Sequence, residues 1–289
     1  MSTTPTILIT GKNGQLGSEL VGIHSSYPGY KFVFVDRQQL DLASLENLSA
    51  LFELHRPAYF INAAAYTAVD KAETEKELAM AINGMAPGKI AAFCRQYSTK
   101  LIHISTDYVF DGLGKSPYKP GDPTSPVNFY GETKLKGEQL AIAGNHATII
   151  IRTAWVYSSY GHNFVKTMLR LMSERSEIGV VSDQIGTPTY ARDLAVAIME
   201  IIEKGADHYG TYHFSNEGVL SWYDFACAIR DKAGLTCQVN SIGTAEFPTP
   251  AKRPAYSVLD KTSLEKDYEI QPRDWQEALQ ECLSYLQRI

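Results

Sequence analysis

The chain of 289 residues has a formal net charge of −5, with 44% hydrophobic and 20% charged residues. This composition is ordinary for a globular protein, and the length suits one large α/β unit or a main domain with a smaller partner. The acidic balance argues against nucleic-acid and membrane partners, and no apolar run approaches the ~18 residues of a membrane-spanning helix.

The N-terminal motif is T-I-L-I-T-G-K-N-G-Q-L-G. Residues 7–9 predict a short buried strand, and apolar residues between 15 and about 25 predict a helix. A strand, a glycine turn and a helix in this order form a phosphate-binding site. Gly11 permits the tight turn, Gly14 lets the backbone approach a pyrophosphate, and Gly17 allows close packing of the helix on the sheet. The segment therefore predicts dinucleotide binding.

A second strand is predicted at residues 31–35, and Asp36 and Arg37 follow it directly. An acid at this position hydrogen-bonds an adenosine ribose and favours NADH, because it repels a 2′-phosphate. Arg37 would instead pair with that phosphate, so the sequence leaves the choice between NADH and NADPH open. Asp41 and Leu42 would border the adenine, although Asp41 would equally well cap a helix that begins near Leu42.

Strands and helices alternate further along the chain, with a strand at residues 59–62, a helix at about 77–96 and a strand at 101–105. The strand at 59–62 runs into three alanines at 63–65, whose small side chains let the backbone lie against a flat ligand. Thr106 follows the strand at 101–105, at the carboxyl edge where open α/β sheets bind their ligands. This alternation predicts a mainly parallel sheet with right-handed crossovers.

Tyr130 and Lys134 lie four residues apart on a predicted helix, so their side chains share one face. A free tyrosine has a pKa of ~10 and exchanges protons poorly at neutral pH. A cation held beside it favours the phenolate and lowers the pKa toward the working range. A reductase needs such a pair when hydride reaches a carbonyl carbon and the oxygen takes a proton.

The alternation extends through the next strand and loosens after Tyr157. A strand at residues 148–152 leads to Trp155, a strand is predicted at 178–182, a helix at about 192–204, and another helix starts at Ser221 with a capping box. The chain thus predicts an α/β fold, a Rossmann-type doubly wound parallel sheet with a smaller mixed α/β C-terminal substrate domain. The predicted NAD(P)-binding domain is 1–152 with about 185–217 returning to it, and the substrate-binding domain is about 153–184 and 218–289.

Several motifs, in their order along the chain, resemble one family. They are G-x-x-G-x-x-G at 11–17, T-A-V-D-K-A-E at 67–73, S-T-D-Y-V-F-D-G at 105–112, D-Q-I-G-T-P-T at 183–189 and K-R-P-A-Y-S-V-L at 252–259. With Tyr130 and Lys134, they resemble the extended short-chain dehydrogenase/reductase superfamily and, within it, the dTDP-4-dehydrorhamnose reductase family, over essentially the whole chain. The resemblance implies reduction of the C4 ketone of dTDP-4-dehydro-β-L-rhamnose to dTDP-β-L-rhamnose by NADPH or NADH.

The resemblance also implies roles for individual residues. Tyr130 would donate the proton to the C4 oxygen, Lys134 would bind the nicotinamide ribose, and Thr106 would polarise the same oxygen. The residues implied at the cofactor are Gly11, Asn13, Gly14, Gln15, Leu16, Gly17, Asp36, Arg37, Asp41, Leu42, Ala63, Ala64, Ala65, Tyr66, Thr67, Tyr130 and Lys134. Those implied at the dTDP-sugar are Thr106, Asp107, Tyr108, Trp155 and Arg253, with the Arg253 guanidinium on the diphosphate.

A metal site is not predicted. Some members of the resembling family bind Mg²⁺ through glutamates at a dimer contact, and Glu19 matches one such position. Arg192, however, stands where another acid is expected, and a cation there opposes metal binding. The chain would be a monomer or a homodimer.

Three alternatives share parts of this pattern. A nucleotide-sugar dehydratase or epimerase would have the same glycine loop, but Tyr108 rather than a glutamate follows Asp107, which disfavours dehydration. A related reductase would give another epimer at C4, and a regulatory subunit would bind NADP without turnover.

The sequence predicts a cytoplasmic protein without a signal peptide. Its four cysteines are scattered without metal-ligand spacing, and its N-terminus enters a strand almost at once.

Overall fold

The computed structural model describes residues 4–287. A fully parallel sheet has the strand order β10-β5-β4-β3-β1-β2. Its strands are β1 (Thr6–Thr10), β2 (Lys31–Val35), β3 (Tyr59–Asn62), β4 (Lys100–Thr106), β5 (Thr148–Thr153) and β10 (Gly210–His213). The chain runs outward from β1 to β2 and then returns to β3 on the other side of β1. The carboxyl edge between β1 and β3 is therefore a topological switch point, where ligands of such sheets bind.

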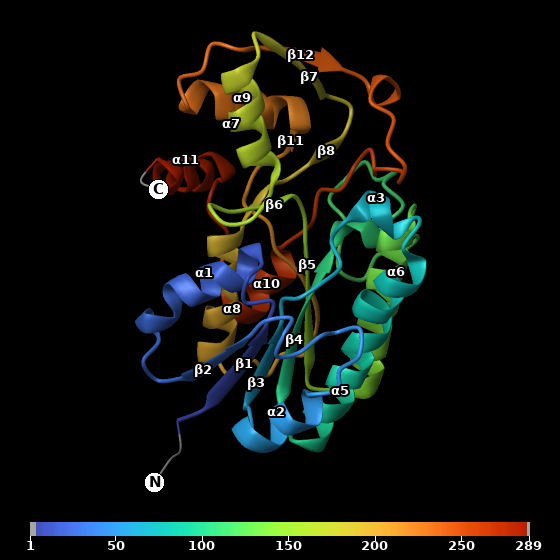
Figure 1. Ribbon diagram of the computed structural model, residues 1–289, viewed down its shortest axis with the longest axis vertical. Helices are drawn as coiled ribbons and strands as arrows, with labels where there is room; N and C mark the ends of the chain where they lie inside the picture. The colour runs from blue at the N-terminus through green and yellow to red at the C-terminus, as the bar shows by residue number, and fades with distance from the viewer. Residues whose placement is uncertain (1–3, 288–289) are drawn as a thin grey trace.

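Helices cover both faces of this sheet, which confirms the predicted doubly wound architecture (Figure 1). One face carries α1 (Gln15–Ile23), α8 (Ala191–Glu203) and α10 (Thr262–Tyr268); the other carries α2 (Leu48–His55), α5 (Ala86–Gln96) and α6 (Phe129–Gly144). Successive residues of a strand point to opposite faces, so Ile7 and Ile9 join the cluster around α8, whereas Leu8 joins the cluster around α2 and α5. Strands buried on both faces read as continuous apolar runs for this reason.

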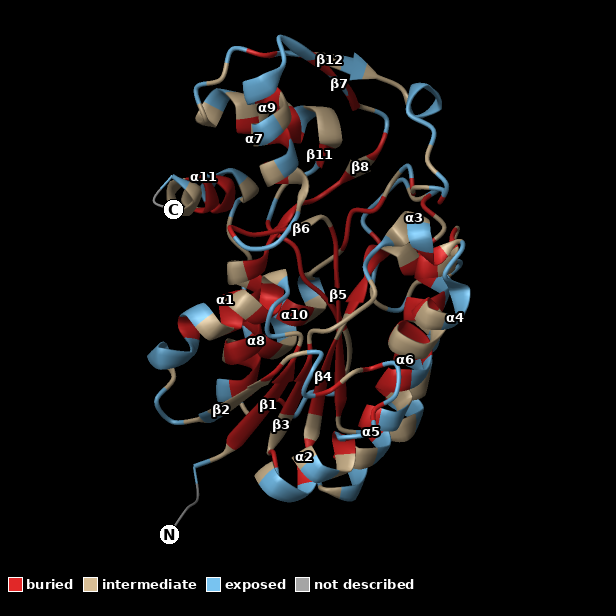
Figure 2. Ribbon diagram, in the orientation of Figure 1, coloured by how far each residue is buried: buried red, intermediate tan, exposed pale blue. Residues whose placement is uncertain are grey.

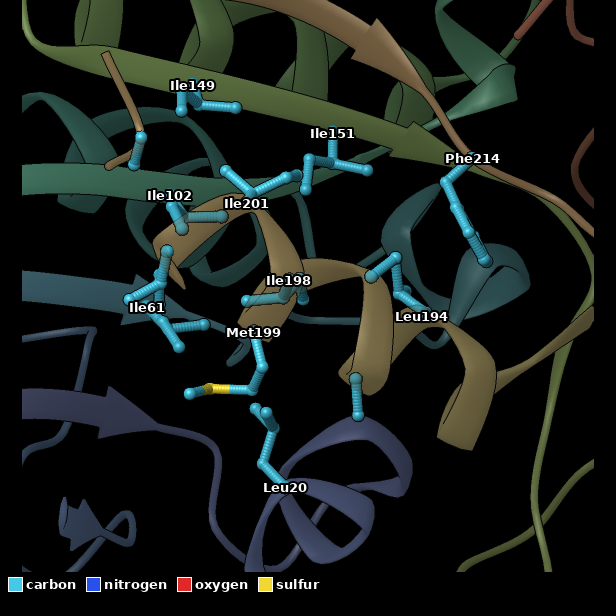
Figure 3. Packing of buried hydrophobic residues seen from close by; sticks show 14 of the residues in the cluster. Leu20, Ile61, Ile102, Ile149, Ile151, Leu194, Ile198, Met199, Ile201 and Phe214 are labelled. Carbon is cyan, nitrogen blue, oxygen red and sulfur yellow. The ribbon is translucent and has the colours of Figure 1, made fainter. Parts of the chain in front are cut away.

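Helix α8 supplies much of the packing on its face. Figure 3 shows Ile198 and Ile201 on α8 directed at the strand residues, and Met199 directed at Leu20 of α1. Each side chain of this size contributes roughly 1.5–3 kcal/mol when it is fully buried. A helix that is distant in sequence thus holds the glycine-loop helix against the sheet.

Most of the remaining elements gather beyond the carboxyl edge of the sheet, around a third apolar cluster (Figure 2). They include the helices α7 (Phe164–Glu174), α9 (Trp222–Lys232) and α11 (Trp275–Leu286), and three short strand pairs. These pairs are β7 (Glu177–Val181) with β12 (Gln238–Ile242), β8 (Ile185–Gly186) with β11 (Leu220–Ser221), and β6 (Val156–Tyr157) with β9 (Thr189–Tyr190). The capping box at Ser221 is confirmed, since Ser221 and Asp224 exchange side chain–backbone hydrogen bonds.

Two details of the predicted secondary structure differ from the structure. No helix begins near Leu42: α2 begins at Leu48, because the Asp41 carboxylate accepts from Ala43 N at 3.0 Å and forms a turn of its own. The helix expected at 77–96 starts as α4 (Lys76–Ala79), passes through the π-helical segment η2 (Met80–Met85) and continues as α5. Within residues 4–287, no helix is both long and apolar enough to cross a bilayer.

Candidate active site

Tyr130 lies in the first turn of α6, whose N-terminus is fixed by Asn128. The Asn128 side chain accepts from Gly131 N at 2.8 Å and donates to Lys252 O at 2.8 Å. The Tyr130 ring is buried and lies edge-on to the Tyr108 ring, with centroids 5.6 Å apart. One helix cap thus positions Tyr130 and ties its helix to the segment 252–259.

The environment of Tyr130 keeps its phenol protonated. Burial raises the pKa of Tyr130, the neighbouring Thr106 hydroxyl lowers it, and the charge of Asp107 raises it. A phenol with a raised pKa keeps its proton at neutral pH and can supply it to a ligand oxygen. Thr106 Oγ1 donates to Asp107 Oδ1 at 2.9 Å and accepts from Tyr108 N at 3.2 Å.

Lys134 lies one turn beyond Tyr130 and is also buried. Its Nζ donates to Ile104 O on β4 at 2.6 Å. Burial lowers the pKa of Lys134 to about 8, and the charge of Glu138 raises it. The expected lowering of the Tyr130 pKa by Lys134 was wrong for this structure: burial raises that pKa, and the Lys134 ammonium is directed to the Ile104 carbonyl.

Asp107 is a buried carboxyl group beside Thr106. It is 2% exposed, and burial raises its pKa to about 6, while the nearby hydroxyl of Ser257 and the hydrogen bond from Thr106 lower it. Its Oδ2 has no hydrogen-bond partner within residues 4–287. An unpartnered carboxyl oxygen at the carboxyl edge of the sheet is able to accept from, or donate to, a bound polar ligand.

Trp155 follows β5 and has a left-handed backbone conformation with φ 49°. Its ring stacks on that of Trp222, with centroids 3.6 Å apart and an interplanar angle of 12°. Gly186 makes room for this ring, since a Cβ there would lie 2.7 Å from it. Because Thr153 on β5 pairs in register with Thr106 on β4, the stacked rings extend from the same edge of the sheet.

Arg253 is engaged in an ion pair. Its Nη2 lies 2.8 Å from Asp70 Oδ2, and its Nη1 donates to Ala251 O at 3.3 Å. Asp70 belongs to the short helix α3 (Val69–Ala72), and its Oδ1 accepts from Ala251 N at 3.1 Å. Two of the motifs that carry the resemblance, at 67–73 and 252–259, therefore meet through this pair.

The glycine loop has the shape of an anion site. Gly11 has φ 80°, and a Cβ on it would lie 2.8 Å from Ala64 N, while a Cβ on Gly17 would collide with Gly11 O. Gly14 caps α1 without a side-chain hydrogen bond. The cradle fits the pyrophosphate of a dinucleotide, with backbone N–H groups as donors. Asn13 is exposed on the turn, Gln15 is half-buried and Leu16 is buried.

The expected adenosine-side residues lie after β2. The Asp36 carboxylate accepts from two backbone N–H groups of its own turn, at 3.0 and 3.1 Å. Arg37 is 73% exposed and lies 3.5 Å from Asp41. Leu42 is buried in the cluster around α2 and α5. Arg37 is thus the residue of this group that is freest to reach a ligand.

Asn83 is a structural anchor that sequence reasoning missed. It accepts from Tyr66 N at 2.8 Å, donates to Tyr66 O at 2.9 Å and donates to Thr133 Oγ1 on α6 at 3.2 Å. It therefore fixes the Ala63–Thr67 segment, expected along the cofactor, against the Tyr130 helix. A polar residue within the apolar run A-M-A-I-N-G-M was the available signal, and π-helical turns such as η2 frequently occur at functional sites.

Glu19 and Arg192 do not fit a divalent cation. The buried Glu19 carboxylate accepts from Ser158 Oγ at 2.6 Å and lies 3.7 Å from Arg192 Nη1. Arg192 Nε lies 3.5 Å from Glu281. The guanidinium thus lies between two carboxylates, and residues 4–287 contain no cluster of three or more His, Cys, Asp or Glu with metal-ligand geometry.

Comparisons with known proteins agree on one family. The family model described as the RmlD substrate binding domain matches residues 5–288. A dTDP-4-dehydrorhamnose reductase of Aggregatibacter actinomycetemcomitans is 42% identical over 96% of this chain and 98% of that protein. A crystal structure of a dTDP-4-dehydrorhamnose reductase from Clostridium acetobutylicum has a TM-score of 0.94 at 42% identity, covering 98% of this chain and 99% of that one. The Bacillus anthracis reductase in complex with NADP has a TM-score of 0.94 at 39% identity, covering 98% and 100%.

Proposed function

The chain belongs to the dTDP-4-dehydrorhamnose reductase family, and from this premise we propose that it reduces the C4 ketone of dTDP-4-dehydro-β-L-rhamnose to dTDP-β-L-rhamnose with NADPH or NADH. The observation that carries the proposal is the buried Tyr130 phenol beside Thr106 at the carboxyl edge of β4. A neighbouring glycine loop that fits a pyrophosphate supports it, because the reaction needs a proton donor and a dinucleotide at one edge of the sheet.

The chemistry of the reduction is divided between cofactor and protein. Bound NAD(P)H supplies the hydride. Tyr130 donates its proton to the C4 oxygen, because its raised pKa keeps it protonated until the oxygen becomes basic. Thr106 donates a hydrogen bond to the same oxygen, and the buried Lys134 ammonium stabilises the phenolate that Tyr130 leaves behind.

We place the sugar nucleotide between the carboxyl edge of the parallel sheet and the apolar cluster around α7, α9 and α11. Asp107, Tyr108 and Trp155 would line the sugar, and Arg253 would reach the diphosphate by sharing its guanidinium with Asp70. The cofactor would extend from the glycine loop along Ala63–Thr67 and Arg37.

This arrangement assigns the substrate-binding domain to about 153–184 and 218–289, and the cofactor domain to 1–152 with about 185–217. We further propose a cytoplasmic monomer or homodimer, whose four free cysteines suit a reducing compartment.

The test is oxidation of NADPH and of NADH with enzymatically generated dTDP-4-dehydro-β-L-rhamnose, with the product resolved from its C4 epimer. Formation of dTDP-β-L-rhamnose establishes the reaction and its stereochemistry. Formation of the epimer would replace the proposal by a related reductase. Tight NADP binding without any oxidation would contradict the enzymatic proposal and favour a regulatory subunit.

A further inference from the structure

The hydroxyl hydrogen of Thr106 is committed to a protein acceptor. Thr106 has one hydroxyl hydrogen, and it points to Asp107 Oδ1 at 2.9 Å. Thr106 Oγ1 accepts from Tyr108 N at 3.2 Å, and the Tyr130 phenol lies close enough for the Thr106 hydroxyl to affect its pKa. The Thr106 hydroxyl hydrogen is therefore directed to a carboxyl oxygen. While Asp107 is ionised it can only accept, so Thr106 has no hydrogen to offer to a ketone.

The surroundings of Asp107 favour its neutral form. The group is 2% exposed, and its second oxygen has no partner within residues 4–287. The groups that face it are Tyr130 from α6, Tyr108 from its own turn and the hydroxyl of Ser257 from the segment 252–259. The neighbouring pair of Arg253 and Asp70 acts on Tyr108. Burying a carboxylate without a cation is costly, and a sugar that covers the site removes more water from it.

We propose that Asp107 carries a proton while the ketone is bound, so that it donates to Thr106 Oγ1 and leaves the Thr106 hydrogen free for the C4 oxygen. This inference rests on the proposed function and assigns Asp107 a positioning role in it. The 2.9 Å contact between Asp107 and Thr106 is kept, and only its direction reverses. No bond to Asp107 forms or breaks, because hydride goes to C4, the Tyr130 proton goes to its oxygen, and Asp107 retains its own proton.

The proposal predicts that kcat of the reductase is highest at acid pH and falls as Asp107 loses its proton. This fall is the Asp107 limb of the pH profile. The folded-state pKa of Asp107 is raised to about 6, so kcat should fall about tenfold per pH unit above the pKa of this group in the complex. Lys134, with a pKa lowered to about 8, would give a separate change at higher pH. A profile without a limb that responds to Asp107 overturns the proposal.

The deciding variants are Asp107→Asn and Asp107→Ala. An asparagine amide donates at every pH, so Asp107→Asn should lower kcat a fewfold at acid pH but remove the Asp107 limb. Asp107→Ala removes the donor and should lower kcat more than tenfold throughout. Glu132→Gln, an exposed carboxyl on α6, is the matched control and should keep the wild-type profile. An Asp107→Asn profile that retains the limb, or matches that of Asp107→Ala, contradicts the proposal.

A readout without turnover separates this inference from the proposed function. The infrared carbonyl stretch of a protonated carboxyl group should titrate in the wild-type complex with the dTDP-ketone and oxidised NADP, which cannot react, and be missing in the same complex of Asp107→Asn. Absence of that difference overturns the inference whatever the activity. If the wild-type protein shows the titrating band but does not reduce the dTDP-ketone, the proposed function fails and the protonation of Asp107 stands.

Discussion

Burial controls the ionisable groups at the edge of β4. It raises the pKa of Tyr130 and of Asp107 and lowers that of Lys134 to about 8, in each case because the charged form is poorly solvated. Spacing along α6 explains why Tyr130 and Lys134 share a face, but their proton affinities follow from what covers them. The protonation states of these three side chains therefore depend on the elements that bury them.

Tyr130→Phe should fold and bind NADPH normally while kcat falls about 10²-fold or more, the range expected when a general acid is lost. The ring is retained, so its edge-on contact with Tyr108 persists. Steady-state kinetics and NADPH titration by fluorescence quenching are the measurements. Unchanged turnover would rule out Tyr130 as the proton donor.

Asp107→Asn should stabilise the protein at neutral pH. The folded-state pKa of about 6 lies above the ordinary value of 3.8, so the folded protein binds this proton more tightly than the unfolded chain. Stability contributed by Asp107 is therefore present at low pH and is lost as pH rises between these values, a loss of roughly 3 kcal/mol at most. The Tm difference between Asp107→Asn and wild type should grow across that interval. A constant difference would contradict the raised pKa.

At the scale of the elements, short strands and turns hold the aromatic side chains of the site. The β8–β11 pair brings Gly186 to the Trp155 ring, and the capping box at Ser221 starts α9 at Trp222, on which that ring stacks. The left-handed backbone of Trp155 is uncommon for a bulky residue, so its surroundings must impose the conformation.

Gly186→Ala should displace the Trp155 ring, since the added Cβ would lie 2.7 Å from it. We expect kcat/KM for the sugar nucleotide to fall about tenfold, roughly 1.4 kcal/mol, while NADPH affinity is kept. The near-ultraviolet circular dichroism of the tryptophan pair should change in parallel. Gly121→Ala is the matched control, because a Cβ there meets nothing within 4 Å. An unaltered spectrum with unaltered kinetics would show that the ring does not depend on Gly186.

At the scale of the whole molecule, ion pairs join segments that are far apart in sequence. Arg273 binds Asp193 and Glu281, each at 2.7 Å, and links α8 to α11, while Arg192 connects Glu281 to Glu19 on α1. On the other side of the molecule, Arg253 links α3 to the segment 252–259. Such pairs fix how the elements beyond the sheet sit over its carboxyl edge.

Arg253→Met and Asp70→Asn should have different consequences if Arg253 also contacts the diphosphate. Both variants break the same ion pair and should lower Tm. Only Arg253→Met should raise KM for the dTDP-sugar, by about tenfold or more, because a guanidinium–phosphate contact is lost. Thermal unfolding and kinetics of both variants test this. Equal KM values in the two variants would limit Arg253 to a structural role.

Features that depend on local pattern could be predicted from the amino-acid sequence. Apolar runs marked β1 to β5, the glycine spacing at 11–17 marked the phosphate loop, and the interval between Tyr130 and Lys134 placed both on one helical face. The short sequence motifs, taken in their order along the chain, were sufficient to identify the family. These features could be predicted because backbone periodicity and glycine conformations are set by residues that are neighbours in the chain.

The environment of those residues depends instead on contacts between distant parts of the chain. The turn at Asp41, the anchoring of Tyr66 by Asn83, the pairing of Arg253 with Asp70 and the stacking of Trp155 on Trp222 join positions that no local pattern connects. The raised pKa of Asp107 and the direction of the Thr106 hydrogen bond likewise depend on which distant elements exclude water from them. Burial and partner identity are properties of the packed chain, and they set the chemistry that this site can perform.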